Sequence, residues 1–486
     1  MTHAARPLSA IIDDVPASFS DLRITGLSSD SRKVEPGFVF FALAGSKADG
    51  AFYINDALQR GAVAIISESN SPAELPNTIA FLKVKDARLC LAQAASRFFA
   101  RQPETIVAVT GTAGKSSVAD FTRQIFSYAK KRAASLGTIG IVRDDQIIYG
   151  ALTTPDPVSL HQTLQSLADE GITHLAMEAS SHGLDQKRLD GVRIKAAAFT
   201  NLGHDHLDYH GTQEAYLKAK LRLFDTLLPQ DGVAVINADA PYSKAVAAIA
   251  RERGLSLVSV GQSGHDITLE RVTRDGFDQR LDLTIRGQKA QIRLALAGDF
   301  QTSNALVAAG LALAVGIEQT IIIEALSHLK GVPGRLERVG IKRDGLIVID
   351  YAHKPDALAA ALDALRPFVT GRLICVFGCG GDRDTAKRPL MGAIAFEKAD
   401  DVIITDDNPR SEDPARIRQA ILATCARAED IGDRRLAITH ALDRMGPGDV
   451  VLIAGKGHET GQIIGEEVIA FSDHAVVADY LREHAA

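Results

Sequence analysis

Residues 107–117 read VAVTGTAGKSS, an apolar strand followed by a Gly-Lys-Ser turn and the start of a helix. Gly111 and Gly114 let the backbone turn so that its N–H groups face an anion, and the positive end of the following helix points to the same place. Lys115 then reaches the β- and γ-phosphates of a nucleoside triphosphate, and the Ser116 hydroxyl ligates Mg²⁺. The helix itself is indicated by apolar residues at helical spacing, which are Val118, Phe121, Ile125 and Phe126. We therefore predict a phosphate-binding loop; the alternative is a glycine-rich turn with an exposed lysine.

Length and composition limit the classes of protein to consider. The chain has 486 residues, 46% of them hydrophobic, four cysteines and a formal net charge of -6 at pH 7. A globular chain of this length predicts about three domains. The mild acidity argues against a nucleic-acid partner and a basic membrane anchor. The N-terminus lacks the pattern of a signal peptide, and the longest apolar run, 305–317, is too short to cross a bilayer. We expect a cytoplasmic monomer without membrane insertion, whose scattered cysteines are reduced and bind no metal.

The order of strand-like and helix-like segments predicts an α/β protein with largely parallel sheets. Residues 263–298 differ, because their polar and apolar residues alternate as in antiparallel strands. The Gly- and Pro-containing segment 331–337 is typical of a linker. We predict a small N-terminal α/β domain (1–102), a central P-loop ATPase-type domain with a parallel sheet and helices (103–332), and a C-terminal Rossmann-like α/β domain (333–486).

Polar side chains follow two predicted strands of the central domain. The strand at 172–178 ends with Glu178, and the strand at 194–200 leads into the histidine-rich sequence LGHDHLDYHG. Ligands of parallel sheets bind at the carboxyl ends of the strands. If both strands lie beside the strand before the loop, Glu178 and one of these histidines approach Ser116, around Mg²⁺ and ATP.

Eight motifs together resemble the Mur ligases, and within them the type that acts on UDP-N-acetylmuramoyl-L-alanyl-D-glutamate in peptidoglycan synthesis. They occur in the order TGTAGKSS, MEASSHGL, TNLGHDHLDYHG, GRLE, DYAHKPDAL, GCGGDRD, DNPRSEDP and AGKGHE, between residues 110 and 459, and the resemblance as a whole covers almost the entire chain. The shortened phosphate loop is itself characteristic of that family. Two departures are Ala113 and Gln301, where the family usually has asparagine.

The resemblance implies an ATP- and Mg²⁺-dependent ligase that converts a substrate carboxylate into an acyl phosphate, which an amine then attacks. It assigns Lys115, Lys220 and His206 to catalysis. The implied ATP-binding residues are Gly111, Thr112, Gly114, Lys115, Ser116, Ser117, Asn304, Arg335, Asp350 and His353. The implied metal ligands are Ser116, Glu178, His206 and Lys220, the last as a carbamate. From the residues alone, Lys220 is a solvated lysine beside Lys218 and Arg222, and Arg335 is a surface arginine in a linker.

The resemblance also assigns the two other substrates. Residues implied to bind the UDP-muramoyl dipeptide are Ser31, Ser46, Thr153, Thr154, Ser181, Gln186 and Arg188. The acceptor of this family type is meso-2,6-diaminopimelate or L-lysine, which differ by one distal carboxylate. Arg410 is suited to bind that carboxylate through two hydrogen bonds and to repel the ammonium of lysine. The implied diaminopimelate-binding residues are Arg383, Asp407, Asn408, Arg410, Gly455 and Glu459, with Glu459 receiving the distal ammonium.

Alternatives remain at this stage. Three alternatives would also use a phosphate loop. They are the same reaction with L-lysine or another amino acid, a folylpolyglutamate-synthetase-like ligase, and a P-loop small-molecule kinase. A kinase has no need of a separate C-terminal pocket of Arg, Asn and Glu, and the DNPR motif argues against a folylpolyglutamate synthetase. A binding protein without catalytic activity is the reading least supported by the motifs. We therefore predict addition of diaminopimelate.

Overall fold

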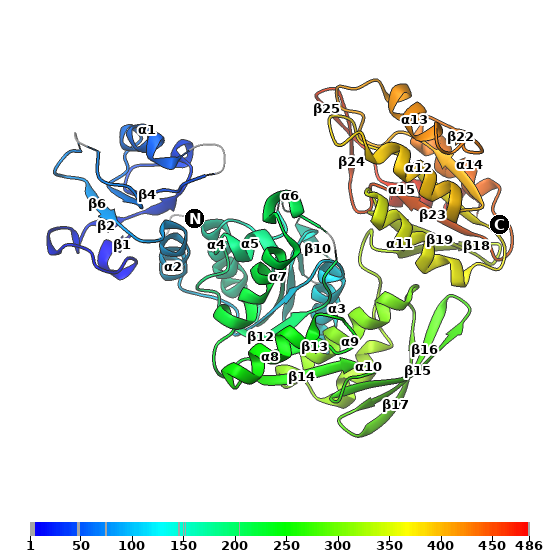
Figure 1. Cartoon of the computed structure of the whole chain (residues 1–486), viewed down its shortest axis with the longest axis horizontal. Coiled ribbons are helices and arrows are strands. Elements are labelled where there is room, and N and C mark those ends of the chain that lie inside the picture. The colour runs from blue at the N-terminus through cyan, green and yellow to red at the C-terminus, as the bar shows by residue number, and fades with distance from the viewer. Residues whose placement is uncertain are drawn as a thin grey trace. The chain divides into compact units, whose positions relative to one another are not determined.

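The computed structural model describes residues 5–45, 49–72, 75–143, 146–148, 150, 152–203 and 205–484. The chain divides into two compact units. The first contains Met1–His265 and Gly310–Glu318, and the second contains Asp266–Ala309 and Gln319–Ala486. Figure 1 labels helices and strands along the chain. The predicted domain boundaries after residues 102 and 332 stay predictions.

The N-terminal part of the first unit contains a parallel sheet with the order β3-β4-β5-β6. Alternate residues of β4 enter different apolar cores, Val39 and Phe41 on one face and Phe40 and Ala42 on the other. Because both faces are covered, the strand is a continuous apolar run. The strands are β3 (Gly26–Ser28), β4 (Phe38–Ala42), β5 (Ala64–Ser67) and β6 (Ala80–Lys83), with an antiparallel pair β1 (Arg6–Pro7) and β2 (Arg23–Ile24); the helices are α1 (Ile54–Gln59), α2 (Ala87–Phe98) and the short 3-10 helices η1 (Leu8–Ala10), η2 (Ala17–Phe19), η3 (Ser31–Lys33) and η4 (Gly50–Tyr53).

The central sheet of the first unit has the order β10-β9-β8-β11-β7-β12-β13-β14. Its strands β8, β11, β7, β12, β13 and β14 are parallel, and β9 and β10 form an antiparallel edge. The strands are β7 (Thr105–Thr110), β8 (Ala133–Gly137), β9 (Gly140–Arg143), β10 (Gln146–Ile148), β11 (His174–Glu178), β12 (Ile194–Phe199), β13 (Val233–Asn237) and β14 (Ser256–Gly261). Strand β7 lies between β11 and β12, so the expectation that both polar strand ends flank the phosphate loop is confirmed.

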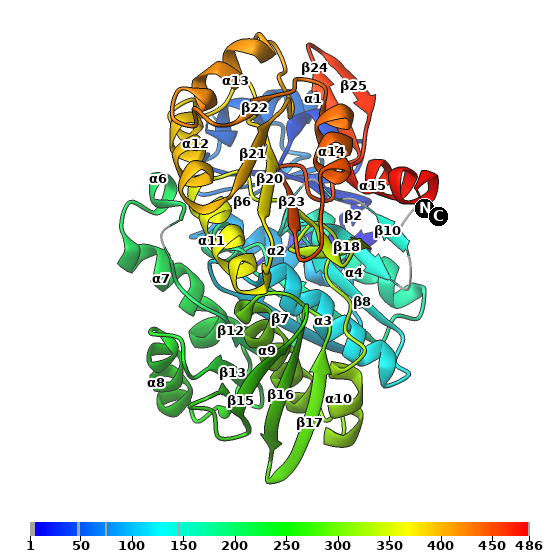
Figure 2. The same cartoon turned by 90° about the vertical axis from the view of Figure 1, so that its right-hand side faces the viewer.

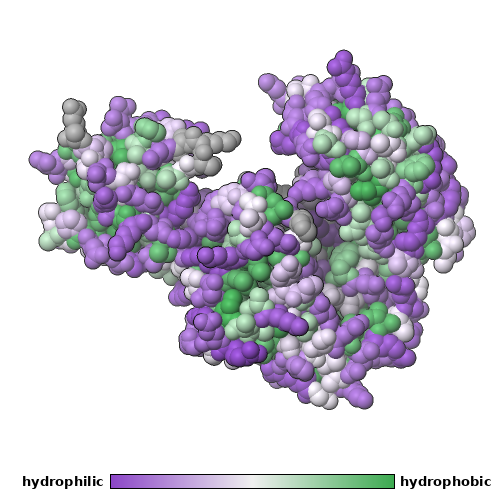
Figure 3. Space-filling model, viewed as in Figure 1, coloured by the Kyte–Doolittle hydropathy of each residue, from purple (hydrophilic) through white to green (hydrophobic). Residues whose placement is uncertain are grey.

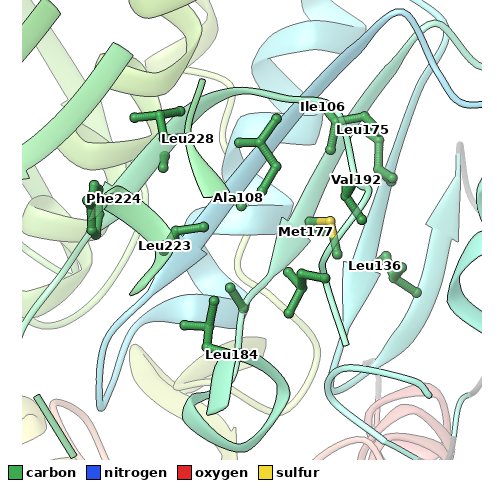
Figure 4. Packing of buried hydrophobic residues seen from close by; sticks show 14 of the residues in the cluster. Ile106, Ala108, Leu136, Leu175, Met177, Leu184, Val192, Leu223, Phe224 and Leu228 are labelled. Atoms are coloured by element: carbon green, nitrogen blue, oxygen red, sulfur yellow. The ribbon is translucent and has the colours of Figure 1, made fainter. Parts of the chain in front are cut away.

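Helices cover the central sheet because its strands are apolar on both faces. Ile106 and Ala108 of β7 pack with residues of β11 and of several helices on one face (Figure 4). Helix α3 contacts β8 and β11, and the ring of its buried Phe126 packs edge-on against His174 of β11 at 4.9 Å. The helices are α3 (Lys115–Tyr128), α4 (Pro157–Asp169), α5 (Ser181–Asp185), α6 (Leu207–His210), α7 (Gln213–Arg222), the π-helix η5 (Leu223–Leu227) and α8 (Ser243–Arg253).

The second unit begins with the antiparallel strands predicted for 263–298, which confirms that expectation. They are β15 (Ile267–Asp275), β16 (Asp278–Ile285) and β17 (Gln288–Leu294), followed by α9 (Asp299–Ala314), whose residues from Gly310 onward belong to the first unit, and by α10 (Gln319–Leu326). Helix α9 contains most of the apolar run 305–317, and its residues from 304 onward are buried almost without interruption. The run is therefore a core helix of a globular protein.

The C-terminal sheet of the second unit has the order β18-β19-β23-β20-β21-β22, parallel except for the edge strand β18. Helices α11 to α13 pack on one face and α14 and α15 on the other, as Figure 2 shows. The strands are β18 (Glu337–Lys342), β19 (Gly345–Asp350), β20 (Leu373–Phe377), β21 (Asp401–Ile404), β22 (Glu429–Asp430) and β23 (Val450–Ala454), with the hairpin β24 (Gly461–Ile464) and β25 (Glu467–Ala470); the helices are α11 (Pro355–Leu365), η6 (Arg366–Phe368), α12 (Lys387–Lys398), α13 (Pro414–Leu422), α14 (Arg434–Asp443) and α15 (Asp473–Glu483). This doubly wound arrangement confirms the predicted α/β class.

Hydrophilic and hydrophobic residues are interspersed on the surface in the view of Figure 3. Within the described part of the chain, no helix combines the length and the apolar character needed to cross a membrane. The four cysteines are free thiols, and Cys375, Cys379 and Cys425 are buried.

Candidate active site

The phosphate loop connects β7 to α3 through two glycines with positive φ. Gly114, at the N-terminus of α3, has φ 85°, which is the left-handed region that glycine adopts readily. Gly111 has φ 151°, and a Cβ atom there would lie 1.9 Å from Oγ1 of Thr200. Any side chain at position 111 therefore collides with the end of β12, which explains why the loop needs glycine.

The loop is held by the segment after β12. The backbone N–H of Thr112 donates to the carbonyl of Asn201 at 2.9 Å, and the N–H of Ala113 donates to the Asn201 side chain at 3.0 Å. Nζ of Lys115 donates to the carbonyls of Gly111 (2.9 Å) and Thr112 (3.0 Å), so this lysine lies over the loop. The Ser116 and Ser117 positions follow in the first turn of α3, Ser116 partly exposed and Ser117 buried.

Lys220 of α7 is buried beside the same loop, with only 1% of its surface exposed. Its Nζ donates to the carbonyl of Gly111 at 2.7 Å and lies 4.2 Å from the centre of the Tyr216 ring. Burial and the nearby Lys115 ammonium lower the pKa of Lys220 to about 6. The reading of Lys220 as a solvated lysine, which the sequence alone gave, is therefore wrong: the helix directs this side chain into the protein.

Tyr216 is a site residue that the sequence reasoning missed. Its hydroxyl lies 3.1 Å from Oγ1 of Thr112, which also accepts the N–H of Gly203 at 2.8 Å. The tyrosine thus connects α7 to the phosphate loop. The available signal was its position four residues before Lys220, because residues at that spacing lie on one face of a helix.

Glu178 lies at the end of β11, paired in register with Val109 of β7. Its side chain is 2% exposed, and its oxygens accept the N–H of Thr138 (2.8 Å) and the Thr138 hydroxyl (3.1 Å). No Lys, Arg or His among the described residues forms an ion pair with it. A buried carboxylate with only neutral partners is suited to bind a cation, so Glu178 fits the expected Mg²⁺.

His206 begins α6 with a left-handed backbone, φ 54°. Its ring packs edge-on against His182 at 4.7 Å and lies 6.3 Å from the ring of Tyr216. Tyr216 in turn contacts Lys220, so His206 lies near that lysine. Among the described residues, His, Cys, Asp and Glu side chains do not by themselves make a group of three that could hold a metal ion. The expected ligand set therefore depends on Ser116 and Lys220 as well.

Residues assigned to the muramoyl dipeptide lie next to Glu178. The Thr153 hydroxyl is 3.0 Å from that of Thr138, and the Thr154 hydroxyl donates to the Glu178 carbonyl at 3.1 Å. Arg188 donates to the Thr154 carbonyl at 2.7 Å and to the Gln186 side chain at 2.7 Å. Ser181 is buried at the start of α5.

Ser31, one of the two N-terminal residues assigned to the same substrate, lies in the 3-10 helix η3 and has no contact with that cluster among the described residues. Ser31 is buried in the N-terminal part and hydrogen-bonds Asp56. Ser46 lies outside the described residues.

In the second unit, the ATP-assigned residues surround Tyr351, another residue that sequence reasoning missed. The Arg335 guanidinium lies 5.2 Å from the Tyr351 ring, and the His353 ring lies 4.6 Å from it. The Asp350 carboxylate accepts the N–H groups of Leu336 and Ala352, both at 2.7 Å. Desolvation raises the pKa of Asp350 more than Arg335 and these N–H groups lower it.

Asn304 is buried in α9 and donates to Gln301 at 3.3 Å, and Gln301 in turn donates to the Arg335 carbonyl at 3.1 Å. Gln301, one of the two departures from the family pattern, thus connects α9 to the GRLE segment.

The acceptor-assigned residues form a polar cluster at the carboxyl ends of β21 and β23. Asn408 donates to Oε2 of Glu459 at 3.0 Å, and both residues contact Nζ of Lys456, at 3.0 and 3.2 Å. Asp407 lies 3.4 Å from the same Nζ. Gly455, with φ 112°, turns the chain between β23 and Lys456. Lys456 is the third residue that sequence reasoning missed.

Arg410 is held at the edge of this cluster. Its backbone has φ 51°, and its Nη1 donates to the Gly381 carbonyl at 2.8 Å. The backbone N–H of Arg410 donates to Ile463 of β24 at 3.1 Å. Arg383 is exposed and donates to the neighbouring Asp382 carbonyl at 3.4 Å, and no contact within the described part of the chain brings it into the cluster.

The fold and these sites define an α/β protein with a P-loop domain, a separate Rossmann-like domain and a small N-terminal sheet. Comparison of the sequence with models of known protein families agrees with this class. Residues 23–99 match the Mur ligase family catalytic domain, 109–312 the Mur ligase middle domain, and 334–457 the Mur ligase glutamate ligase domain. The chain therefore belongs to the Mur ligase family.

Two curated relatives carry the name UDP-N-acetylmuramoyl-L-alanyl-D-glutamate--2,6-diaminopimelate ligase. The one from Mesorhizobium japonicum is 55% identical over 99% of both chains, and the one from Bradyrhizobium diazoefficiens is 55% identical over 96% of both. A solved structure with the same protein name is 33% identical, covers 100% of both chains and has a TM-score of 0.73. The similarity thus extends over the N-terminal, central and C-terminal parts.

Proposed function

We propose that this chain is an ATP-dependent ligase that joins meso-2,6-diaminopimelate to the D-glutamate of UDP-N-acetylmuramoyl-L-alanyl-D-glutamate, a step of peptidoglycan synthesis. The observation that carries the proposal is 55% identity, over 99% of both chains, to a relative with this name. The polar cluster of Asp407, Asn408, Lys456 and Glu459 supports it, because a kinase would have no use for a second charged pocket in another domain.

The reaction has two steps. A carboxylate is a poor acyl donor because an oxide ion does not leave, so an oxygen of the glutamate carboxylate first attacks the γ-phosphorus of ATP and ADP leaves. The amine of the acceptor then attacks the acyl carbon, phosphate leaves with one oxygen of the original carboxylate, and the amine loses a proton. The first step brings two anions together, and their repulsion must be neutralised by cations.

Lys115 is placed to supply one of these charges. Its Nζ is bound to two loop carbonyls, and a γ-phosphate at the N-terminus of α3 would replace them as its partner. The metal would be held by Glu178, Ser116, His206 and a carbamate on Lys220. When bound, Mg²⁺ neutralises phosphate oxygens.

Lys220 fits the proposed carbamate for a chemical reason. Only the neutral amine attacks CO₂, and burial keeps the pKa of Lys220 at about 6. An ammonium ion so close to Lys115 would repel both that residue and a metal ion, whereas a carbamate carries a negative charge and two oxygen ligands. Tyr216 and the Gly111 carbonyl hold the side chain in place.

The acceptor would bind in the second unit. Arg410 and Glu459 supply one positive and one negative group, which match the distal carboxylate and ammonium of meso-diaminopimelate. L-lysine has the ammonium but lacks the carboxylate, so Arg410 would have no partner and would repel it. The N-terminal Ser31 and Ser46 and the central Thr153, Thr154, Ser181, Gln186 and Arg188 remain assigned to the nucleotide-sugar substrate.

One experiment tests the proposal. The purified chain is incubated with ATP, Mg²⁺, the UDP-muramoyl dipeptide labelled with ¹⁸O in its glutamate carboxyl groups, and an equimolar mixture of amino acids. We expect mass spectrometry to find the diaminopimelate adduct and one ¹⁸O atom in the released phosphate. Phosphate without the label would overturn the acyl-phosphate route, and an adduct with L-lysine in equal amount would overturn the acceptor assignment.

A further inference from the structure

Lys456 follows β23 and is completely buried, with 0% of its surface exposed. Its Nζ lies 3.0 Å from Oδ1 of Asn408, 3.2 Å from Oε2 of Glu459 and 3.4 Å from Oδ1 of Asp407. A lysine so completely buried is rare unless it is paired. All three partners belong to the cluster assigned to the acceptor, so this ammonium is built into that pocket.

The charge of Lys456 has a clear electrostatic role. Asp407 and Glu459 are two carboxylates that share one ammonium, and without it they would repel each other in a partly dehydrated site. Arg434, a buried cation on which Asp407 and Glu459 also act electrostatically, is already engaged by both oxygens of Asp473 at 2.8 Å. Lys456 is therefore the ammonium that holds these two carboxylates together.

The contacts also fix the orientation of Glu459. Its Oε2 accepts hydrogen bonds from both Asn408 and Lys456, whereas its Oε1 has no hydrogen-bond donor among the residues that the structure describes. The Asn408 amide is itself oriented, because its Oδ1 accepts from Lys456 and from the N–H of Ile463 at 3.0 Å. Glu459 thus leaves Oε1 available to a ligand, while the protein holds Oε2 in place.

We propose that Lys456 is a positioning residue of the acceptor pocket, which holds Glu459 and Asn408 so that Oε1 of Glu459 receives the distal ammonium of a diamino acid. The inference rests on the proposed function, since it assumes that Glu459 binds the acceptor. It predicts that Lys456 acts on the acceptor through Glu459 and leaves the ATP and nucleotide-sugar sites unaffected.

The test compares Lys456→Met with Lys456→Arg, which keeps the charge. The matched control is Lys342→Met, because Lys342 is a partly buried lysine of the same domain, bound to Tyr480 and the Leu442 carbonyl, far along the chain from the pocket. Steady-state kinetics give kcat and the KM for each of the three substrates. Thermal unfolding and circular dichroism check that each variant is folded.

We expect Lys456→Met to raise the KM for meso-diaminopimelate about 10- to 100-fold, the range of one or two hydrogen bonds between charged groups. The KM values for ATP and the dipeptide nucleotide should change less than about twofold, and Lys456→Arg should recover part of the loss. Lys342→Met should leave all three KM values unchanged. In a variant that already carries Glu459→Gln, Lys456→Met should raise the KM for meso-diaminopimelate by less than a further factor of about three, because Lys456 acts on the acceptor through Glu459.

Three results would overturn the inference: an unchanged KM for the acceptor, an equal rise in all three KM values, or full additivity with Glu459→Gln. If Lys456→Met does not fold, the same comparison is made with Lys456→Gln, which keeps a donor to Asn408. The wild-type reaction judges the proposed function separately. The kinetics of each variant are compared with those of the wild type, using the amino acid that the wild type accepts. If that amino acid is not diaminopimelate, the proposed function fails, but the role of Lys456 is still tested.

Discussion

Lys220 provides the sharpest prediction, which is that its side chain takes up CO₂ near neutral pH. The perturbation is removal of CO₂ and bicarbonate from the buffer, followed by their return. Burial lowers the pKa of this lysine to about 6 from 10.5. The amine must be neutral to attack CO₂, so the lowered pKa determines how much reactive amine exists.

The magnitude follows from these two values. At pH 8.0 about 99% of a lysine with a pKa of 6 is neutral, whereas roughly 0.3% of a lysine with a pKa of 10.5 is. The reactive form of Lys220 is therefore enriched roughly 300-fold over a solvated lysine. As the pH falls through about 6 the amine gains a proton, so we expect carbamate occupancy and ligase activity to fall together.

The assay is ¹³C NMR of the protein in ¹³C-labelled bicarbonate at pH 8.0, with ligase activity measured in parallel in CO₂-depleted buffer. The control is Lys218→Met, because Lys218 lies on the same helix but is exposed. We expect one carbamate signal that Lys218→Met keeps and Lys220→Met loses, and activity that bicarbonate restores. The absence of that signal at pH 8.0, or full activity in Lys220→Met, would refute the reasoning.

Three further predictions concern the second unit. Arg410→Ala should lower kcat/KM for meso-diaminopimelate about 100-fold, the effect of losing a charged hydrogen-bonded pair, without lowering that for L-lysine; competition kinetics with both amino acids measure the ratio, and an unchanged ratio contradicts the assignment. Arg434 and Asp473 form an ion pair with both side chains 0% exposed, so Arg434→Met alone should destabilise the protein by about 3–5 kcal/mol, and the double variant Arg434→Met/Asp473→Leu by less, as measured by urea unfolding; a double variant less stable than the single one would count against this. Burial opposes the positive charge of His474, but Glu337, 2.6 Å away, raises the pKa of this histidine overall. The stabilisation by the His474–Glu337 pair is therefore complete below the unfolded pKa of 6.5, and it is lost as the pH rises through the higher pKa of the folded state. The free energy of unfolding should therefore fall over that interval in the wild type more than in His474→Gln, and parallel pH curves would disprove it.

Much of the fold could be predicted because it depends on local patterns. The apolar runs at 105–110, 174–178 and 345–350 are strands of parallel sheets, and the alternating segment 263–298 is antiparallel. Burial of both faces makes a parallel strand a continuous apolar run, so the pattern is visible without a structure. The phosphate loop was equally visible, since its glycines and lysine are adjacent in the chain.

The site could be predicted only where residue type and motif were sufficient. The contacts that distinguish Lys220 from the exposed Lys218 could not be predicted, because the side of α7 that faces the protein depends on the packing of the helix against the phosphate loop. Tyr216, Tyr351 and Lys456 were missed for the same reason. Each is an ordinary residue type whose role comes from partners up to about a hundred residues away, such as Thr112 for Tyr216.

The sequence by itself therefore determined the class of fold, the place of the phosphate loop and the kinds of side chain available for chemistry. Tertiary structure alone decided which lysines are buried and which partners they meet. The physical reason is desolvation: the free energy of an ammonium ion depends on the water and the charges around it, and these are set by segments distant in sequence. Among the residues that the structure describes, Lys220, with a lowered pKa, and Lys456, between two carboxylates, are the two buried lysines.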